Sequence, residues 1–338
     1  MTERDEEEDY SLERHQRPIV YHSEYNVSAF GIEHLHPFDT SKWRRVICYL
    51  KEMNLITDST LVEPNLPTFE ELVRVHDRKY LKSVRNPLKA AQIVEIPLVG
   101  CLPPCIIENK LLHPLRYPLQ AGGSVLAANL ALKYGWAINV GGGFHHASHS
   151  DGGGFCFYAD ITMAICDLFD KKAISQAIVV DLDAHQGNGH ARDFADNKDV
   201  FVFDVFNPNV YPHDREARQF INKAVHVDGH TTDTSYISEL RKQLTQCIDD
   251  RERLNPSGFD FIMFNAGTDC LFGDPLGAMK LSPQCIIARD EVVFKLAKSK
   301  GIPICMLTSG GYQKDNALLI AKSIENLNSK NLIDLSIN

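Results

Sequence analysis

Runs of apolar residues alternate with amphipathic segments along the chain from Ala137 onward. A continuous apolar run predicts a strand that is buried on both faces, and an apolar residue at every third or fourth position predicts a helix. The predicted strands are 137–140, 173–183, 200–206, 259–267 and 302–312. The predicted helices are 159–169, 235–250, 282–300 and 316–327, the third with Ser282 as N-cap and Pro283 in its first position. This alternation predicts the α/β class, with a parallel sheet that helices cover on both faces.

The pattern is less regular in the first third of the chain. Residues 19–21 are apolar enough for an outer strand, and residues 41–54 and 68–84 have helical spacing. Residues 95–118 are rich in proline and have little periodicity, which predicts a long, ordered surface loop.

The composition fits one soluble globular domain. Apolar residues make up 44% and charged residues 23% of the 338 residues. No repeat or Pro/Gly/Ser-rich linker divides the chain, so we expect a single domain over residues 15–338. The acidic run at the start predicts that residues 1–14 form a solvated, disordered segment.

The charge of the chain bears on its binding partners, and its cysteine content bears on the cellular compartment. A net charge of −9 and the lack of a basic stripe argue against direct binding to nucleic acid and suit a basic peptide better. No apolar run reaches the ~20 residues of a membrane span, and the start lacks the pattern of a secretory signal. Nine cysteines without a framework spacing favour a reducing compartment inside the cell, without separating nucleus from cytoplasm.

Polar, glycine-rich motifs follow four of the predicted strands. They are GGGFHHASHSDGGGF (141–155), DLDAHQGNGH (181–190), NAGTDCLFGDPLG (265–277) and SGGYQ (309–313). Ligands of an open parallel sheet bind outside the carboxyl ends of its strands. If the four strand ends face one side, the four motifs converge on one site.

Asp183, His185 and Asp269 are the candidate metal ligands in these motifs. Asp183 and His185 are two residues apart, so on an extended backbone their side chains point the same way, and Asp269 would come from a neighbouring strand end. Two carboxylates and one imidazole leave a fourth tetrahedral position open, which is typical of a catalytic zinc ion. The D-x-H pattern alone fits a cluster of capping and turn residues as well. Asp269, the paired histidines and the glycine loops favour the metal.

His145 and His146 suit general acid–base chemistry beside such a metal, because imidazole titrates near neutral pH. Asp181 and Asn188 are available as hydrogen-bond partners, one for each ring. A histidine pair by itself is also typical of a packed or exposed pair. Tyr312 follows two glycines, and its hydroxyl could donate to a developing oxyanion.

Taken together, these motifs resemble those of the histone deacetylase superfamily, which has the zinc-dependent arginase/deacetylase fold. The matching stretches, in the order that the family keeps, are GGGFHHASHSDGGGFCFYAD, VVDLDAHQGNG, NAGTDCLFGDPLG and TSGGYQ. The stretches YNVSAFGIEHLHPFDTSKW (25–43) and WAINVGGGFHH resemble the class IV, eleventh-member type most closely. The resemblance implies a single-domain arginase/deacetylase-like fold and a zinc-dependent hydrolase of acyl-lysine amides.

The resemblance also implies the cofactors and partners. One zinc ion would bind to Asp183, His185 and Asp269, and backbone groups near Asp181, Asp183 and His185 would hold a structural potassium ion. The substrates would be acyl-lysine peptides or proteins, with histone tails as candidates, and a co-regulator complex would be a candidate partner. Acetyl is the acyl group of the family, and the class IV type makes long fatty acyl chains an alternative.

Catalytic roles carry over position by position. His145 matches the first histidine of the family's pair, with Asp181 behind it, and His146 would be the general base for the attacking water. Tyr312 would polarise the scissile carbonyl. Asn188 stands where class I proteins have an aspartate, so His146 should be less basic than with a carboxylate partner.

The resemblance places four more residues in the tunnel for the acyl-lysine side chain. Gly154 and Phe155 match one wall, and Gly310 belongs to the glycine loop that lines the substrate. Tyr211 stands where the family usually has the opposing phenylalanine, which changes the lining of the tunnel and not the chemistry.

Three alternatives remain open. A binuclear, arginase-like hydrolase shares the fold, but its D-x-H-x-D motif needs an aspartate where Gly187 stands. An amidohydrolase for acetylpolyamines or other small amides would have the same zinc site. A non-catalytic scaffold that binds acyl-lysine would keep the fold, although every residue that the chemistry needs is present.

Overall fold

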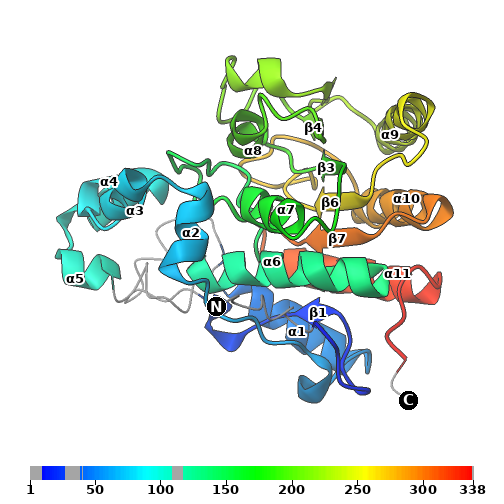
Figure 1. Cartoon of the computed structure of the whole chain (residues 1–338), viewed down its shortest axis with the longest axis horizontal. Helices are drawn as coiled ribbons and strands as arrows, with labels where there is room; N and C mark the ends of the chain where they lie inside the picture. Colours follow the sequence, from blue (N-terminus) through cyan, green and yellow to red (C-terminus); the bar gives the residue numbers. More distant parts are fainter. Residues whose placement is uncertain (1–9, 27–38, 40, 109–116, 337–338) are drawn as a thin grey trace, which may run out of the picture.

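The computed structural model describes residues 10–26, 39, 41–108 and 117–336. Its centre is one sheet of seven strands in the order β1-β2-β7-β6-β3-β4-β5, all parallel (Figure 1). The strands are β1 (Ile19–Val20), β2 (Trp136–Asn139), β3 (Ala177–Asp181), β4 (Val200–Phe206), β5 (Lys223–His226), β6 (Phe261–Asn265) and β7 (Ile304–Leu307). The predicted parallel sheet is confirmed. The edge strand β5 was not predicted, because only Val225 in it is buried and the apolar signal is weak.

Helices cover both faces of this sheet. They are α1 (Lys42–Glu52), α2 (Phe69–Val75), α3 (Arg78–Ser83), α4 (Pro87–Ile93), α5 (Pro104–Ile106), α6 (Tyr117–Tyr134), α7 (Asp160–Asp170), α8 (Asn188–Asp193), α9 (Asp233–Leu254), α10 (Pro283–Lys300) and α11 (Asn316–Ser329). Alternate residues of β3 point to opposite faces. Ile178 and Val180 pack in one core with α1, α9, α10 and α11, whereas Ala177 and Val179 pack in another with α6 and α7.

The predicted helices after residue 159 correspond to α7, α9, α10 and α11. The start of α10 is as predicted: the Ser282 hydroxyl accepts a hydrogen bond from the Cys285 N–H at 3.1 Å, and Pro283 occupies the first turn. Gly301 ends this helix with a left-handed φ of 68°.

Helix α6 was missed by the sequence prediction. Figure 1 shows it lying along the sheet beside α7. Two glycines near its start lower the helix propensity. A Cβ on Gly123 would lie 2.0 Å from the Tyr25 hydroxyl, and one on Gly122 would lie 2.3 Å from the Asn65 carbonyl oxygen. The glycines therefore let neighbouring segments approach a helix that is buried on more than one side, where no single apolar stripe marks it.

The predicted loop at 95–118 is only partly correct. Its described part contains short helical turns, one of them at Pro97–Cys101 and another in α5, and Pro118 lies in the first turn of α6. Helices α3, α4 and α5 form a lobe beside the sheet, at the left of Figure 1.

The acidic start of the chain lies partly outside the described residues, which begin at Tyr10. Its described part runs against the outer helices: Lys133 of α6 donates to the Ser11 hydroxyl at 2.6 Å, and Lys171 donates to the Tyr10 hydroxyl at 2.6 Å. The domain boundary at residue 14 stays a prediction. None of the helices in the described part of the chain has the length and apolar character that a membrane crossing needs.

The predicted helix at 68–84 is two helices, α2 and α3, separated at His76. The His76 side chain is 2% exposed, and its Nε2 accepts a hydrogen bond from the Ala159 N–H at 3.0 Å. Its backbone adopts an extended conformation, with ψ of 141°. The buried imidazole therefore ties the helical lobe to the loop that begins α7, and the chain leaves helical geometry to make this contact.

We expect His76 to make the fold sensitive to acid. Burial lowers the pKa of His76 to about 4 from its ordinary value of 6.5. Because the folded pKa is the lower one, its contribution is complete above pH 6.5 and is lost as the pH falls toward 4. The free energy of unfolding should fall by up to about 3 kcal/mol over this window. Urea denaturation at several pH values measures it. A His76→Gln variant should show a shallower loss, and equal pH slopes in the two proteins would contradict the assignment.

Candidate active site

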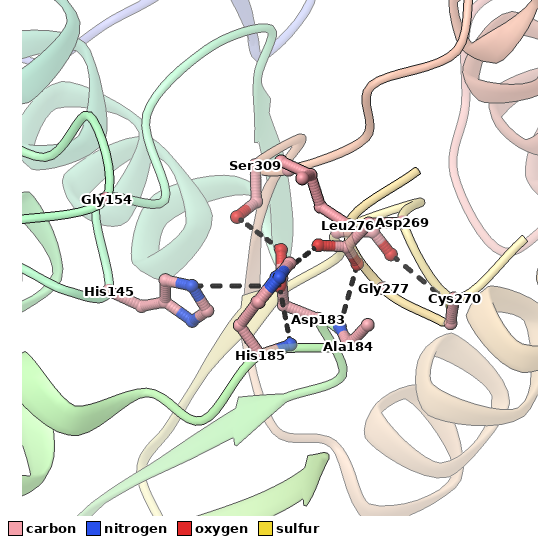
Figure 2. A network of polar contacts seen from close by, with 12 residues as sticks. His145, Gly154, Asp183, Ala184, His185, Asp269, Cys270, Leu276, Gly277 and Ser309 are labelled. Carbon is pink, nitrogen blue, oxygen red and sulfur yellow. Dashed lines mark hydrogen bonds and ion pairs between the residues drawn. The ribbon is translucent and has the colours of Figure 1, made fainter. Parts of the chain in front are cut away.

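Four neighbouring strands carry the predicted motifs to one edge of the sheet. β2, β7, β6 and β3 are consecutive in the sheet and parallel, so their carboxyl ends lie on the same side. Figure 2 shows Asp183, Asp269, Ser309 and His145, which come from the loops after these four strands, grouped around His185. The structure therefore brings the four motifs together as the sequence predicts.

Asp183, His185 and Asp269 form a compact, buried group. The His185 Nδ1 lies 3.0 Å from Asp183 Oδ1 and 2.8 Å from Asp269 Oδ2. One potential ligand atom from each residue lies within 4.8 Å of the others. Asp183 and His185 do not continue the strand, because β3 ends at Asp181. Hydrogen bonds of the loop after β3 orient them instead: the Asp183 N–H donates to Asp181 at 3.2 Å and the His185 N–H donates to Asp183 at 3.0 Å.

The two buried carboxylates of this group, Asp183 and Asp269, favour the binding of a divalent cation. Burial and the neighbouring Asp183 carboxylate raise the pKa of Asp269 to about 7. Burial acts to lower the pKa of His185, but Asp269 and Asp183 outweigh it and raise that pKa well above its ordinary value. Two carboxylates this close and this buried repel each other. A divalent cation between them compensates both charges, and the O/O/N donor set is one that zinc accepts.

A binuclear site would need an aspartate at position 187 as a ligand for the second metal, and this chain has a glycine there. A Cβ on Gly187 would lie 2.0 Å from the His190 Nε2 and 2.4 Å from an Asp181 carboxylate oxygen. An aspartate therefore does not fit there without displacing both side chains. This observation argues against the binuclear, arginase-like alternative.

Asp181 lies behind His145 and orients it. The His145 Nδ1 is 2.9 Å from Asp181 Oδ2, which also accepts from the His190 Nε2 at 2.8 Å. The other Asp181 oxygen accepts from the Asn265 amide at 2.9 Å. Burial acts to lower the pKa of His145, but the Asp181 and Asp183 charges raise it to about 9. His145 is therefore held protonated near neutral pH.

Among the described residues, His146, unlike His145, has no carboxylate as its hydrogen-bond partner. Its Nδ1 lies 2.8 Å from the Asn188 side-chain oxygen, and its ring stands 4.1 Å from that of His145, centroid to centroid. Burial and the neighbouring charges of His145 and His185 lower the pKa of His146 well below its ordinary value. The two histidines therefore differ in protonation, which is the separation that a general acid and a general base need.

Tyr312 follows β7 at the end of the glycine loop. Its ring is 6.2 Å from that of His185, centroid to centroid, and its N–H donates to Asp274 at 2.9 Å. Burial and the carboxylates of Asp183 and Asp269 raise the pKa of Tyr312 well above its ordinary value. The phenol thus remains a hydrogen-bond donor at neutral pH.

Two of the predicted tunnel residues, Gly154 and Tyr211, lie directly against His146. A Cβ on Gly154 would be 2.4 Å from the His146 ring, and the Tyr211 ring packs edge-on to His146 with centroids 4.8 Å apart. A Cβ on Gly310 would be 2.3 Å from Asp183 Oδ2. A cavity of about 30 Å³ is lined by Gly154, Phe155 and Gly310 together with His145, His146, Asp183 and Tyr312. These glycines let the walls come close to the reacting groups.

Lys42, which the sequence analysis did not single out, supports the glycine loop. Its side chain is fully buried, and its ammonium group donates to the carbonyl oxygens of Ser309 at 2.7 Å, Gly310 at 3.0 Å and Gly311 at 3.3 Å. The contact joins the first residue of α1 to a loop 267 positions later in the chain. Lys42 therefore fixes the backbone from which Tyr312 projects.

Replacing Lys42 by methionine should loosen this loop. Methionine fills a similar volume but donates no hydrogen bond, so buried carbonyl oxygens lose their donor at a cost of about 1–3 kcal/mol in the free energy of unfolding. Turnover should also fall, because Tyr312 is then less well positioned. Urea denaturation and steady-state kinetics measure both effects. Lys42→Arg keeps a donor and should lose less of each, and a methionine variant with unchanged stability and turnover would contradict this role.

Other supporting residues also escaped the sequence analysis. The Asp160 carboxylate accepts hydrogen bonds from the Gly143 and Phe144 N–H groups at 2.8 and 2.7 Å, which shapes the loop before the histidines. Arg289 is buried and donates to the carbonyls of Leu182 and Gly267 at 3.1 and 2.5 Å. Both residues act through loop backbone, and their positions inside predicted helices gave no signal of it.

The fold and this group of residues define a metal-dependent hydrolase of the parallel-sheet α/β class. A family model described as the histone deacetylase domain matches residues 36–327. Histone deacetylase 2 of Arabidopsis thaliana is 45% identical over 315 residues, which cover 93% of this chain and 79% of that protein. Human histone deacetylase 1 is 25% identical over 311 residues, 88% of this chain and 61% of that protein. The crystal structure of the HDA15 HD domain superposes with a TM-score of 0.72 at 20% identity, over 96% of this chain and 90% of that one.

The chain therefore belongs to the histone deacetylase family. Members of this family are zinc-dependent amide hydrolases, and this protein is an enzyme of that kind. The single-domain arginase/deacetylase-like fold that the sequence predicts is confirmed by the HDA15 domain.

Proposed function

We propose that the protein is a lysine deacylase of the class IV type, which hydrolyses the amide of Nε-acyl-lysine in peptides or proteins. The observation that carries the proposal is the buried group of Asp183, His185 and Asp269 beside two histidines, one bonded to a carboxylate and the other to an amide. The cavity that Asp183, His146 and Tyr312 line is small and suits the end of a slender acyl-lysine side chain. Histone tails are candidate substrates, because an acidic protein surface suits basic peptides.

Each residue of the site has a proposed role. Asp183, His185 and Asp269 would hold the zinc ion, which when bound would supply Lewis acidity toward the amide carbonyl and the attacking water. His146 accepts the proton of the water through its Nε2, because its Nδ1 faces Asn188. The Tyr312 hydroxyl donates to the oxyanion. His145, kept protonated by Asp181, is placed to donate to the departing lysine amine.

We further propose that a potassium ion binds beneath the site, near Asp181. Asp204 is the partner of Asp181 on the adjacent strand, and both carboxylates are fully buried. The Oδ1 of Asp204 has no hydrogen-bond partner among the described residues, and its Oδ2 accepts only one bond there, from the Gly187 N–H at 3.0 Å. A monovalent cation would bind the unpaired Oδ1 of Asp204 and offset the repulsion between the carboxylates of Asp181 and Asp204.

We propose both acetyl and long fatty acyl chains as acyl groups that the enzyme removes from lysine. The class IV resemblance supports long chains. The small cavity among the described residues supports short ones, since the glycines that line it are closely packed: a Cβ on Gly143 would lie 2.4 Å from the Asn265 side-chain oxygen. The stretch 27–38 of the class IV motif lies outside the described residues.

Kinetics on one lysine peptide test the proposal. The peptide carries acyl chains from two to fourteen carbons, and acetylspermidine serves as the small-amide competitor. We expect hydrolysis of acyl-lysine with kcat/KM well above that for the polyamine, and the chain-length optimum then assigns the acyl preference. Hydrolysis of the polyamine alone would favour the small-amide alternative. Bound zinc without hydrolysis of any peptide or polyamine would favour the non-catalytic scaffold.

A further inference from the structure

His146 depends on an amide rather than on a carboxylate for its orientation. The Asn188 Oδ1 lies 2.8 Å from the His146 Nδ1. An asparagine side chain can present either its oxygen or its NH₂ group, and the two choices select opposite tautomers of the histidine. With the oxygen toward the ring, Nδ1 carries the hydrogen and Nε2 can accept a proton. With the NH₂ group toward the ring, Nε2 carries the hydrogen and the ring cannot act as a base there.

Asp214 removes this ambiguity. The Asn188 Nδ2 donates a hydrogen bond to Asp214 Oδ2 at 3.2 Å, on the side of the amide away from His146. An ionised carboxylate only accepts hydrogen bonds, so it binds the NH₂ end of the amide and rejects the oxygen end. The oxygen of Asn188 is therefore left facing the His146 ring.

Asp214 is itself held in its ionised form. Arg192 donates from Nε to Oδ2 at 3.1 Å and from Nη2 to Oδ1 at 2.8 Å, and the Ala217 N–H donates to Oδ1 at 3.0 Å. Burial acts to raise the pKa of Asp214, but the hydrogen bonds from Ala217, Arg192 and Asn188 outweigh it and lower that pKa. Asn188 and Arg192 are four residues apart on α8, so both side chains lie on the face of the helix that meets Asp214.

We propose that Asp214 is a positioning residue for the reaction: it fixes the Asn188 amide and thereby sets the tautomer in which His146 can accept a proton. The inference rests on the proposed role of His146 as the general base. His145 receives its carboxylate directly from Asp181, whereas His146 receives one through an intervening amide. The catalytic base is thus controlled by a loop residue outside the four motifs of the sequence.

The first test reads the tautomer without using activity. Zinc-loaded protein labelled with nitrogen-15 histidine is compared with its Asp214→Asn variant by long-range proton–nitrogen correlation. The signals of His146 are assigned by their loss in His146→Gln. We expect the Nδ1–H form in the wild-type protein and a second, Nε2–H form in Asp214→Asn, because an amide at 214 no longer selects one end of Asn188. A pure Nδ1–H form in the variant would overturn the inference.

The second test moves the carboxylate from 214 to 188. Asp214→Asn should lower kcat for acetyl-lysine peptide by about 10- to 100-fold with little change in KM, the usual effect of losing an outer-shell partner. Adding Asn188→Asp to it should restore most of kcat, because an aspartate at 188 accepts from the His146 Nδ1 without help. The matched control is Glu216→Gln, which removes the negative charge of another acceptor of Arg192 at a residue that does not contact Asn188.

The outcomes separate the possibilities. Wild-type kcat in Asp214→Asn would overturn the inference. So would a double variant no faster than the single one, since a purely structural role for Asp214 is not repaired by a change at 188. If the wild-type protein hydrolyses no acyl-lysine substrate, the proposed function fails, and the tautomer measurement still decides whether Asp214 controls His146.

Discussion

Replacing Asp269 by asparagine is expected to abolish the zinc-dependent activity while leaving the protein folded. Asparagine has the same shape and its oxygen can still accept the hydrogen bond that the Ala184 N–H makes to Asp269 at 2.7 Å. The change removes one negative charge and one anionic ligand. We expect the affinity for zinc to fall by more than about 100-fold, since even outer-shell changes cost 10- to 100-fold. Isothermal titration with zinc and peptide hydrolysis measure the two effects.

Thermal melting in a chelator separates this loss from unfolding. Burial and Asp183 raise the pKa of Asp269 to about 7, so its charge opposes folding at neutral pH when no cation is bound. The asparagine variant should therefore melt at the wild-type temperature or above it in chelator, and zinc should stabilise only the wild-type protein. Asp196→Asn, at an exposed position, is the matched control and should behave as wild type. Zinc affinity in Asp269→Asn equal to that of wild type would contradict the ligand assignment.

Replacing Tyr312 by phenylalanine is expected to lower kcat by about 10²–10³, the cost of one oxyanion donor. The reason is that burial and two nearby carboxylates raise the pKa of Tyr312 well above its ordinary value, so its hydroxyl stays protonated and can donate. The interaction strengthens only as negative charge develops on the carbonyl oxygen. We therefore expect kcat and kcat/KM to fall together, with KM nearly unchanged.

Steady-state kinetics at saturating zinc measure this effect. Tyr49→Phe is the matched control, because Tyr49 packs on the core from α1 and its hydroxyl has no hydrogen bond in the described part of the chain. It should keep wild-type kcat. A Tyr312→Phe variant with wild-type kcat would remove this hydroxyl from the reaction, and a rise in KM alone would make it a substrate-binding group.

The sheet and the metal group could be read from the sequence because both leave local signals. A strand that is buried on both faces is a run of apolar residues, as in β4, where the predicted range 200–206 matches the structure residue for residue. The candidate ligands stand directly after such runs, and the parallel order of the strands then makes them converge. That convergence left open which histidine pairs with which partner; the family resemblance assigned Asp181 to His145 and Asn188 to His146, and the structure has both pairs.

The residues that hold the catalytic loops in place could not be predicted from local sequence patterns. Lys42 and Asp214 contact the catalytic loops through hydrogen bonds whose partners lie far away in the sequence, and nothing in their neighbours marks them. Helix α6 was missed for a related reason: close packing on several sides replaces the apolar stripe by small residues such as Gly122 and Gly123. Local sequence patterns do not show the long-range contacts through which residues such as Lys42 and Asp214 act.

Metal reconstitution tests the central claim most directly. The protein is stripped with a chelator, zinc is added back in steps, and bound metal and acetyl-lysine hydrolysis are measured on the same samples. If Asp183, His185 and Asp269 hold one catalytic ion, hydrolysis should rise in proportion to bound zinc and reach its plateau at one equivalent per chain. Full hydrolysis by the stripped protein, or activity that keeps rising to two equivalents, would contradict it.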